Sequence, residues 1–547
     1  MSKAKCYLLA AISGLFFVLA FPPVGLNLLA FVWLLPLISA LENSENVGAS
    51  RWRLMYVAFL VQHVGTLWWV GSWQANADPF LMIAGVVLCL FHPFFYFVPA
   101  ECYYRFRRRF GLTPALIMLP FIWTAFEWLT SITEWAFPWL CVGYTQVNET
   151  AWVQIADLGG VLLVGFVIVA INSCLYHLIT GLSTKKDEAS KRNFIRQKNN
   201  IIVVAVFALL AIVPKIYSHI RLSEFDADNF AKNPKLNIGI IQPNINPWDK
   251  WSRNPVKNIA DHFKVQDSLS RATSRKIDLS LWSETSITFM GLSVNSYPYD
   301  LSILRPWIDT NDLSLLTGFT EFYFYKPGED VPASAEAFPG DSSRRYSSFN
   351  SAIMVSPSKI RSDVQIYRKM KLTPISERIP YVDQIAWLKN ILRWDVGISN
   401  WALGREQKNL QATGAKGTFA IAPIICIESI HQDFVRQFAK KGAEILTIIT
   451  NDAWYNHTFG PYQHLAIAQM RAIENKRYLA RCANGGISAF ISPAGEIIAQ
   501  AEQYQNSGIA RSIPKIKDLT LYSQIGDVVG WLALACVVVG GIMMRKK

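Results

Sequence analysis

Long apolar runs dominate residues 1–220, whereas shorter runs broken by charged residues make up 221–525. About 20 apolar residues suffice for a helix to cross the hydrocarbon core of a bilayer. The pattern predicts eight membrane helices, near 7–22, 26–41, 54–72, 80–103, 113–133, 159–181, 200–218 and 526–544. We therefore expect a seven-helix membrane domain over 1–220, a soluble catalytic domain over 221–525, and a C-terminal membrane helix with a basic tail over 526–547.

The pattern within 221–525 is that of strands alternating with helices. Short β-branched runs occur at 236–241, 277–282, 313–319, 347–356, 418–427, 444–450 and 487–492. Amphipathic helical patterns cover 256–272 and 463–483, and the polar stretch 321–345 is expected to be a long loop. This alternation predicts an α/β domain, with a layered αββα sandwich as one form. Because the strands are almost continuously apolar, helices should cover the sheets.

The basic residues indicate how the chain crosses the membrane. The expected inner segments, which all carry Lys or Arg, are 1–6, 42–53, 104–112, 182–199 and 545–547. The short outer segments 23–25, 73–79 and 134–158 carry none. Since Lys and Arg favour the cytoplasmic side, both termini should be cytoplasmic and 221–525 periplasmic. The net charge of +13 is thereby explained without a nucleic-acid partner.

The chain has eight cysteines, five of which fall in apolar spans: Cys6, Cys89, Cys102, Cys174 and Cys536. Their sparse spacing does not suggest a disulfide framework. There is no CxxC or HExxH pattern and no glycine-rich phosphate loop, so we expect neither a metal nor a cofactor.

Three reactive side chains follow strand-like runs of the soluble region, where active-site groups of α/β domains are usually found. Glu284 ends LSLWSET, Lys369 lies in YRKMKLTP, and Cys426 lies in IAPIICIESI. A carboxylate can take the thiol proton, and a lysine can favour the thiolate and stabilise an oxyanion. The backbone N–H of Ile427 is a candidate second oxyanion donor. The three residues would make an acyl-transfer site.

Simpler interpretations exist for each residue. Cys426 can be a small core residue, Glu284 a cap, and Lys369 part of a solvated basic face. A Cys–His pair is the rival catalytic arrangement, and His431 at the start of an expected surface helix is nearest to Cys426 along the chain. The histidines of the soluble region are His219, His262, His431, His457 and His464.

The three residues and their flanking motifs resemble the carbon–nitrogen hydrolase (nitrilase) superfamily, which uses a Glu–Lys–Cys triad on an αββα sandwich. The whole chain resembles the apolipoprotein N-acyltransferase family of bacterial inner membranes. The motifs that carry this resemblance include FPPVGLNLLAFVWLLPLI, FEWLTSITEWAFPWLCVGYTQ, IQPNINPWDKW, LWSETSI, YRKMKLTPISERIP, CIES and NDAWYNHTFGPYQHLAIAQMRAIENKRYLARCANGG.

The resemblance implies Glu284 as base, Lys369 as the triad lysine and Cys426 as nucleophile. Further residues that it places in or beside the pocket are Trp251, Glu377, Ile427, Glu428, Asn451, Asp452 and Trp454. The chain departs from the family pattern at Ser283 (usually proline), at Ile375–Ser376 before Glu377 (usually Phe–Gly), and at Ile427 (often aromatic). These departures affect the shape of the acyl pocket and leave the triad intact.

The reaction implied by the resemblance is the last step of lipoprotein maturation. The sn-1 acyl chain of a phospholipid passes through a thioester on Cys426 to the α-amine of the N-terminal S-diacylglyceryl-cysteine of an apolipoprotein. The expected partners are this phospholipid, the diacylated apolipoprotein and the membrane, and we expect a monomer. The alternative is a membrane-anchored nitrilase-like amidase that releases the acyl group to water. A non-catalytic lipid-binding protein is disfavoured by the intact triad.

Some residues of the predicted membrane domain are also candidates for a functional role. Five tryptophans near the outer helix ends predict an interfacial belt or substrate contact: Trp68, Trp69, Trp73, Trp135 and Trp139. Glu127 lies in the fifth apolar span and is either functional or hydrated near the interface. The segments 286–300 and 375–404 are candidate lids because both follow predicted site residues.

Overall fold

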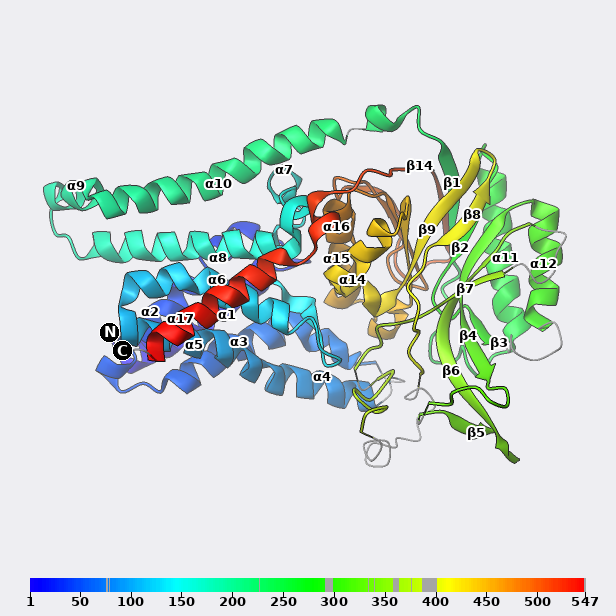
Figure 1. Ribbon diagram of the computed structural model, residues 1–547, viewed down its shortest axis with the longest axis horizontal. Helices are drawn as coiled ribbons and strands as arrows, with labels where there is room; N and C mark the ends of the chain where they lie inside the picture. Colours follow the sequence, from blue (N-terminus) through cyan, green and yellow to red (C-terminus); the bar gives the residue numbers. More distant parts are fainter. Residues whose placement is uncertain are drawn as a thin grey trace.

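The computed structural model describes the chain except for residues 75, 76, 78, 226, 291–298, 333, 339, 358–363, 375, 386–400, 546 and 547. Long helices form one part of the molecule and an α/β domain forms the other (Figure 1). Both termini lie in the helical part, because the last helix, α17, returns from the α/β domain and packs on α6.

Helices occupy all eight predicted membrane segments. The helical part contains α1 (Lys3–Ala20), α2 (Leu34–Asn43), α3 (Arg51–Leu67), α4 (Pro79–Phe91), α5 (Phe97–Phe110), α6 (Leu112–Leu129), α7 (Thr150–Val153), α8 (Ala156–Ser183), α9 (Glu188–Arg196), α10 (Lys198–Glu224) and α17 (Val528–Arg545). Within the described residues, seven helical stretches are long and apolar enough to cross a membrane. The second predicted span is shorter, Asn27–Asn43, and begins as a 3-10 turn. The number of spans therefore stays a prediction.

Two helices differ from the predicted spans. The fourth continues to Phe110 as α4 and α5, joined by the 3-10 turn His92–Tyr96, so the basic residues predicted in a loop lie on helix α5. Helix α8 bends at Gly159 and Gly160, and Gly160 has φ +70°. A Cβ at Gly160 would lie 2.6 Å from the ring of Tyr522, so this close approach requires glycine.

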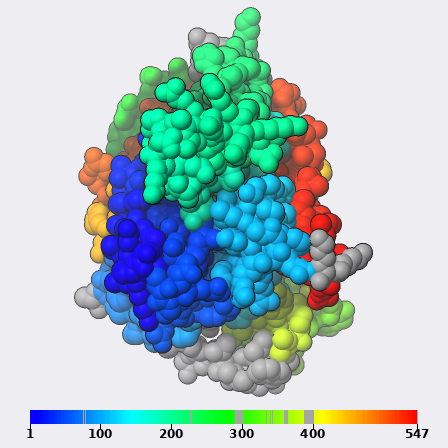
Figure 2. Space-filling model, turned by 90° about the vertical axis from the view of Figure 1, so that its left-hand side faces the viewer, coloured from blue at the N-terminus to red at the C-terminus, as the bar shows by residue number. Residues whose placement is uncertain are grey.

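The end of the helical part away from the α/β domain collects the expected inner segments. Figure 2 shows this end, with the N-terminal residues in dark blue, the α5–α6 region in light blue and the α8–α10 region in green. The basic side chains here are partly paired: Arg107 lies 2.8 Å from Glu42, and Glu101 lies 3.1 Å from Arg51 and 2.9 Å from Arg105.

Two sheets form the α/β domain. The first has the strand order β14-β1-β2-β4-β6-β5, with β3 on β4 and β7 on β6, and the second has the order β13-β12-β11-β10-β9-β8. The strands of the first sheet are β1 (Lys235–Gln242), β2 (Leu279–Trp282), β3 (Ile287–Met290), β4 (Ser314–Phe324), β5 (Glu336–Phe338), β6 (Asp341–Val355), β7 (Val364–Arg368) and β14 (Ser507–Pro514). Those of the second are β8 (Leu410–Gly414), β9 (Gly417–Ile425), β10 (Ile445–Thr450), β11 (Leu479–Ala483), β12 (Ala489–Ile491) and β13 (Ile497–Gln500).

The sheets stack face to face between helices, which confirms the predicted αββα sandwich. Apolar residues of both sheets, such as Ile238 and Ile448, form one core between them. Helices α11 (Pro255–Ala272) and α12 (Tyr299–Asn311) cover the outer face of the first sheet. Helices α14 (Gln432–Lys440) and α15 (Phe459–Asn475) lie on the second sheet, on the side that faces the membrane helices (Figure 1). Helix α16 (Leu521–Ile525) then leads into α17.

Two predictions of local structure were wrong. The helix predicted over 463–483 ends at Asn475, where Lys476 adopts a left-handed conformation, and β11 follows and pairs with β10. The apolar pattern of 479–483 fits a helix and a strand equally well, so only the pairing with β10 selects the strand. The loop predicted over 321–345 is also partly strand, because β4 runs to Phe324 and pairs along its length with β6.

Helix α15 connects the α/β domain to the membrane helices through buried polar contacts. The carboxamide oxygen of Gln463 accepts hydrogen bonds from the indoles of Trp69 (3.0 Å) and Trp139 (2.8 Å). Its nitrogen donates to the carbonyls of Pro22 (3.1 Å) and Thr66 (3.0 Å). Trp69 and Trp139 are therefore buried interface residues and not part of an exposed belt, whereas Trp73 and Trp135 are exposed.

Glu127 is buried in α6, which favours the first of its two interpretations, a functional or structural role, over hydration near the interface. One carboxylate oxygen accepts from the indole of Trp123 (3.0 Å) and the backbone N–H of Val142 (2.9 Å). These contacts anchor the 3-10 segment Val142–Gln146 against the helix.

Candidate active site

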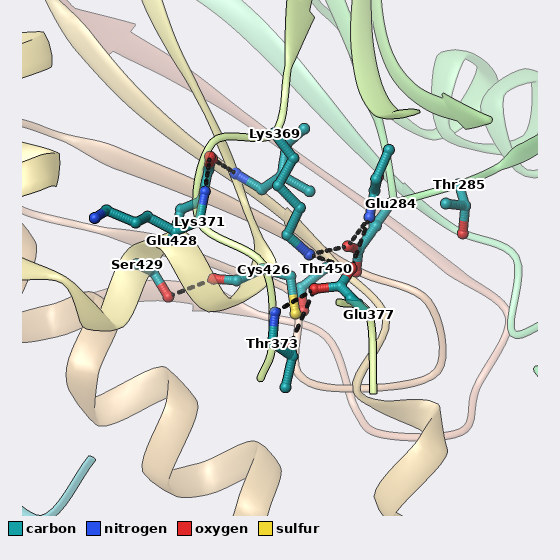
Figure 3. A network of polar contacts seen from close by, with 12 residues as sticks. Glu284, Thr285, Lys369, Lys371, Thr373, Glu377, Cys426, Glu428, Ser429 and Thr450 are labelled. Carbon is teal, nitrogen blue, oxygen red and sulfur yellow. Dashed lines mark hydrogen bonds and ion pairs between the residues drawn. The ribbon is translucent and has the colours of Figure 1, made fainter. Parts of the chain in front are cut away.

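The three predicted triad residues converge from three strand ends. Glu284 follows β2, Lys369 follows β7, and Cys426 follows β9. Strands β9 and β10 run parallel, with Ile424 opposite Ile448, so their carboxyl ends open at the same edge of the second sheet. Figure 3 shows Glu284 and Lys369 of the first sheet facing Cys426 of the second. The site thus lies between the two sheets, at one end of the sandwich.

Lys369 is the centre of the polar cluster. Its Nζ lies 2.9 Å from Oε1 of Glu284 and 2.8 Å from Oε1 of Glu377. The side-chain nitrogen of Asn350, on β6, donates to the same two oxygens at 2.8 and 3.2 Å. The other oxygen of Glu377 accepts from the backbone N–H (2.8 Å) and the hydroxyl (2.9 Å) of Thr373. One ammonium therefore holds two carboxylates in a fixed geometry.

Burial and pairing act in opposite directions on these charges. Burial alone would lower the pKa of Lys369, but the carboxylates of Glu284 and Glu377 raise it well above its usual range. Burial alone would raise the pKa of Glu377, but the ammonium of Lys369 and the Thr373 hydrogen bonds lower it. Lys369 and Glu377 are thus both ionised at neutral pH.

Cys426 occupies a sharp backbone turn. It has φ +47°, a left-handed conformation that a non-glycine residue adopts only at a cost in free energy. The turn leads from β9 directly into the 3-10 segment Cys426–Ile430, and the Cys426 side chain points toward the Lys369 cluster (Figure 3). Burial and the charge of Glu284 raise the pKa of the Cys426 thiol, against the opposing effect of Lys369. The resting thiol is therefore neutral and needs a base.

Glu428 holds the nucleophile turn against the lysine loop. Its carboxylate is fully buried and accepts from the backbone N–H of Ile425 (2.8 Å), the backbone N–H of Met370 (2.7 Å) and the hydroxyl of Tyr367 (2.6 Å). Burial raises its pKa to about 7. Glu428 thereby joins the segments that carry Cys426 and Lys369, and it does so without contacting the triad side chains.

The remaining predicted residues surround this cluster. Ile427 is buried directly after Cys426. Asn451 accepts from the Asn484 side chain at 3.1 Å, and the ring of Trp454 meets that of Trp248 at a centroid distance of 4.8 Å. The carbonyl of Trp454 accepts from the hydroxyl of Ser72 in the helical part (2.6 Å).

Trp251 lies in the turn after β1 and is exposed. At the family departures, Ser283 contacts Ser286 through its hydroxyl (3.0 Å), while Ile375 lies outside the described residues. Parts of both candidate lids also lie outside the described residues: 291–298 in the lid 286–300, and 375 and 386–400 in the lid 375–404.

Two histidines of the α/β domain, His262 and His464, have partners other than the Cys426 sulfur. His431 is buried, so its assignment to a surface helix was wrong; the helix that it precedes, α14, packs against α15 and α16. His262 contacts Asn258 and Ser286 and stacks on Trp282. His464 contacts the Ser429 hydroxyl and the Asp452 carboxylate. This arrangement favours the Glu–Lys–Cys set over a Cys–His pair.

Two residues of the site were not predicted from the sequence. Asn350 joins both carboxylates, and no local signal singled it out, because its strand also carries Ser347, Ser348 and Ser351. Lys250 is buried and donates to the carbonyl of Glu284 (3.1 Å) and the hydroxyl of Thr285 (2.8 Å). Burial lowers its pKa to about 7. Lys250 thereby holds the turn that follows β2, where Thr285 has φ +47°.

Comparison with known proteins agrees with this architecture. Residues 237–514 match the model of the carbon-nitrogen hydrolase family, and residues 13–174 match that of the apolipoprotein N-acyltransferase N-terminal domain. The chain is similar to the apolipoprotein N-acyltransferase of Chlorobaculum tepidum, with 31% identity over 99% of this chain and 96% of the relative. The enzyme of the same name from Geobacter metallireducens is 26% identical over 99% and 96%.

Among solved structures, Nit3 of Saccharomyces cerevisiae, a nitrilase-superfamily member, covers 51% of this chain and 90% of its own, with a TM-score of 0.37 and 14% identity. The class of the α/β domain follows from its sandwich and from the family match: it is a carbon–nitrogen hydrolase domain. The chain as a whole belongs to the apolipoprotein N-acyltransferase family. Together with its apolar helices, this membership makes it a bacterial membrane protein.

Proposed function

We propose that this protein N-acylates bacterial lipoproteins, with Glu284, Lys369 and Cys426 as the catalytic residues. The observation that carries the proposal is the buried Glu284–Lys369–Glu377 cluster beside Cys426, in a chain that joins a carbon–nitrogen hydrolase domain to membrane helices. Its relatives carry the name apolipoprotein N-acyltransferase. The donor is the sn-1 ester of a phospholipid, and the acceptor is the α-amine of an S-diacylglyceryl-cysteine.

In the first half-reaction Glu284 takes the proton of the Cys426 thiol, and the thiolate attacks the ester carbonyl. The Lys369 ammonium and the Ile427 N–H stabilise the oxyanion of the tetrahedral intermediate. The ester C–O bond then breaks, and Glu284 returns the proton to the leaving lysophospholipid oxygen. An acyl thioester remains on Cys426.

In the second half-reaction the α-amine of the diacylated apolipoprotein attacks the thioester. Glu284 accepts a proton from the attacking nitrogen, the C–S bond breaks, and the Cys426 sulfur regains a proton. An amide is more stable than a thioester, so transfer runs downhill without another reactant. The same base thus serves both halves.

The membrane helices hold the site at the bilayer surface, where both lipid-linked substrates are concentrated. In this proposal the catalytic domain 221–525 is periplasmic, and the membrane parts 1–220 and 526–547 leave both termini in the cytoplasm. Support comes from the basic segments and termini that lie at the end of the helical part away from the α/β domain. All site residues come from one chain, and we propose that the monomer is active. The supporting residues are Trp251, Glu377, Ile427, Glu428, Asn451 and Trp454.

The decisive experiment is mass spectrometry of the purified full-length protein after incubation with phospholipid vesicles without acceptor. We expect a hydroxylamine-sensitive mass increase of one acyl chain on the Cys426 peptide, absent from Cys426→Ser. A diacylated lipopeptide should then remove the acyl group and become an N-acyl amide. Release as free fatty acid in the presence of lipopeptide would indicate an amidase-type hydrolase. No adduct on folded protein would refute the thioester mechanism.

A further inference from the structure

A second polar chain lies behind the nucleophile, away from the Lys369 cluster. The hydroxyl of Ser429 donates to the carbonyl oxygen of Cys426 at 2.7 Å and lies 2.8 Å from Nε2 of His464. Nδ1 of His464 lies 3.0 Å from Oδ1 of Asp452. All three side chains are buried, with exposed fractions of 0%, 3% and 3%. The chain thus runs unbroken from Asp452 to the backbone of Cys426.

The outer end of this chain is firmly held. Arg481 donates to the second oxygen of Asp452 at 2.6 Å and to the carbonyl of Ile487 at 2.6 Å. Burial alone would raise the pKa of Asp452, but Arg481 and His464 hold it well below its usual range, so the carboxylate is ionised. The indole of Trp139, from the membrane part, lies 5.6 Å from the His464 ring and closes its other side.

The contacts determine how the chain acts on Cys426. A carbonyl oxygen can only accept, so Ser429 directs its hydroxyl proton at the Cys426 carbonyl. The two ring nitrogens of His464 link the Ser429 hydroxyl to the Asp452 carboxylate. The charge of Asp452 polarises this chain and strengthens the hydrogen bond that ends on Cys426.

The carbonyl at the end of this chain belongs to a particular peptide unit. A peptide is planar, so the direction of the Cys426 C=O fixes the direction of the Ile427 N–H in the same unit. That N–H is the backbone oxyanion donor of the proposed mechanism. Since Cys426 has φ +47°, this peptide is held in a costly orientation that relaxation would change. A hydrogen bond to its carbonyl opposes relaxation and also polarises the N–H.

We propose that Ser429, His464 and Asp452 are positioning residues that orient the Cys426–Ile427 peptide so that its N–H points at the oxyanion. The inference rests on the proposed function, because it assigns a role to that oxyanion donor. Arg481 fixes Asp452, Asp452 fixes His464, and His464 fixes Ser429. None of these side chains contacts substrate; they act through the backbone of the nucleophile.

The proposal predicts a selective defect. Loss of a direct oxyanion donor commonly lowers kcat about 100-fold to 1000-fold. Loss of the side chains that only orient this donor should therefore lower kcat less, by about 10-fold to 100-fold. The defect should appear in thioester formation from phospholipid at saturating concentration, with KM changed by less than about 2-fold. Alkylation of Cys426 by iodoacetamide is a displacement at carbon that develops no oxyanion. Its rate should therefore stay within about 2-fold of wild type, because it needs the thiolate alone.

The experiment measures both rates on the Cys426 peptide of the full-length protein in phospholipid–detergent micelles. The variants are Ser429→Ala, His464→Phe, which keeps a ring beside Trp139, and Ser429→Thr, which should restore acylation. Thr447→Val is the matched control: its buried hydroxyl also donates to a backbone carbonyl, that of Ala422 on β9, at 2.7 Å. It should leave both rates unchanged.

Slow acylation with normal alkylation in Ser429→Ala and His464→Phe would support the relay. Normal acylation in both variants would overturn it, as would an equal loss of acylation and alkylation, which indicates a displaced thiol. The proposed function is judged separately on the wild type. If the wild type forms no thioester while iodoacetamide alkylates Cys426, the thioester mechanism and the relay both fail; if it forms one, only the variants decide on the relay.

Discussion

The ammonium of Lys369 lies 2.9 Å from the carboxylate of Glu284 in a buried site that also contains Glu377. Two carboxylates and one ammonium leave the cluster with a net charge of −1 when all three are ionised. A second negative charge on the Cys426 sulfur is therefore costly, in agreement with the raised pKa of this thiol. Proton transfer from Cys426 to Glu284 moves the charge within the site without increasing it.

Replacing the base should stop both thiol reactions. In Glu284→Gln we expect thioester formation to fall about 100-fold to 10000-fold, because the proposed base can no longer take the thiol proton and Glu377 stays held by Lys369 and Thr373. Alkylation of Cys426 by iodoacetamide should fall as well, which distinguishes this variant from Ser429→Ala. Both rates are measured by mass spectrometry of the Cys426 peptide.

Glu321→Gln provides the control for this prediction. Glu321 is a buried carboxylate on β4 that pairs with Arg368 at 2.5 Å and accepts from Ser351 at 2.9 Å. Its removal should leave the alkylation rate of Cys426 unchanged. Wild-type alkylation in Glu284→Gln would mean that another group deprotonates the thiol.

The second carboxylate should keep the catalytic lysine in place. In Glu377→Gln the Lys369 ammonium loses one of its two carboxylate partners, so it is held less firmly in the position where it stabilises the oxyanion. We expect kcat to fall about 10-fold to 100-fold with little change in KM for phospholipid. Thr373→Val removes the hydroxyl that donates one hydrogen bond to Glu377, and it should have a smaller effect. A rise in KM with unchanged kcat would instead assign Glu377 to substrate binding.

Glu428 should make folding stability depend on pH. Burial raises its pKa to about 7 from an ordinary 4.5, so the folded state binds this proton more tightly than the unfolded state. Its contribution is fully present below pH 4.5 and is lost as the pH rises to about 7. Relative to Glu428→Gln, the wild type should lose on the order of 3 kcal/mol in free energy of unfolding over this window.

Unfolding of the two proteins in detergent, followed from pH 4.5 to pH 8, tests this difference. The free energy of unfolding of Glu428→Gln is lowered by an amount that does not depend on pH, because its amide nitrogen faces the Ile425 N–H at every pH. The pH-dependent part of the difference therefore reports the titration of Glu428. Parallel stability curves would show that the carboxylate stays ionised when buried.

Gln463 should carry much of the attachment between the α/β domain and the membrane helices. Gln463→Leu leaves the indole of Trp139 and the carbonyl of Pro22 without this partner, while the indole of Trp69 still donates to the Thr66 carbonyl at 2.8 Å. Each unpaired buried group costs about 1–3 kcal/mol, so we expect a loss of several kcal/mol and a clearly lower Tm.

Gln469→Leu is the matched control for this loss, because Gln469 lies on the same helix and donates once, to the Gly495 carbonyl within the α/β domain (2.8 Å). It should cost only about 1–3 kcal/mol. Thermal unfolding of both variants in detergent provides the comparison. Equal Tm values would contradict a special role for Gln463 at the interface.

Local pattern predicted most of the elements and failed where neighbours decide. The apolar runs at 236–241 and 444–450 became β1 and β10, because a strand buried on both faces has a continuous apolar signature. Residues 479–483 were placed in a helix, since their pattern fits helix and strand alike and only pairing with β10 selects the strand. His431 was placed on a surface because α15 and α16, which pack against the helix that follows it, come later in the chain.

The sequence by itself predicted the long apolar helices and an α/β domain, because hydrophobic periodicity is a local property, and its motifs predicted the triad residues through the family resemblance. The tertiary structure alone decided that Lys369 meets Glu284, 85 residues earlier in the chain, and that Asn350 joins the same cluster. It also decided that the Ser429–His464–Asp452 chain ends on the carbonyl of Cys426. Such contacts depend on how strand ends from two stacked sheets come together, and no local pattern encodes that distance.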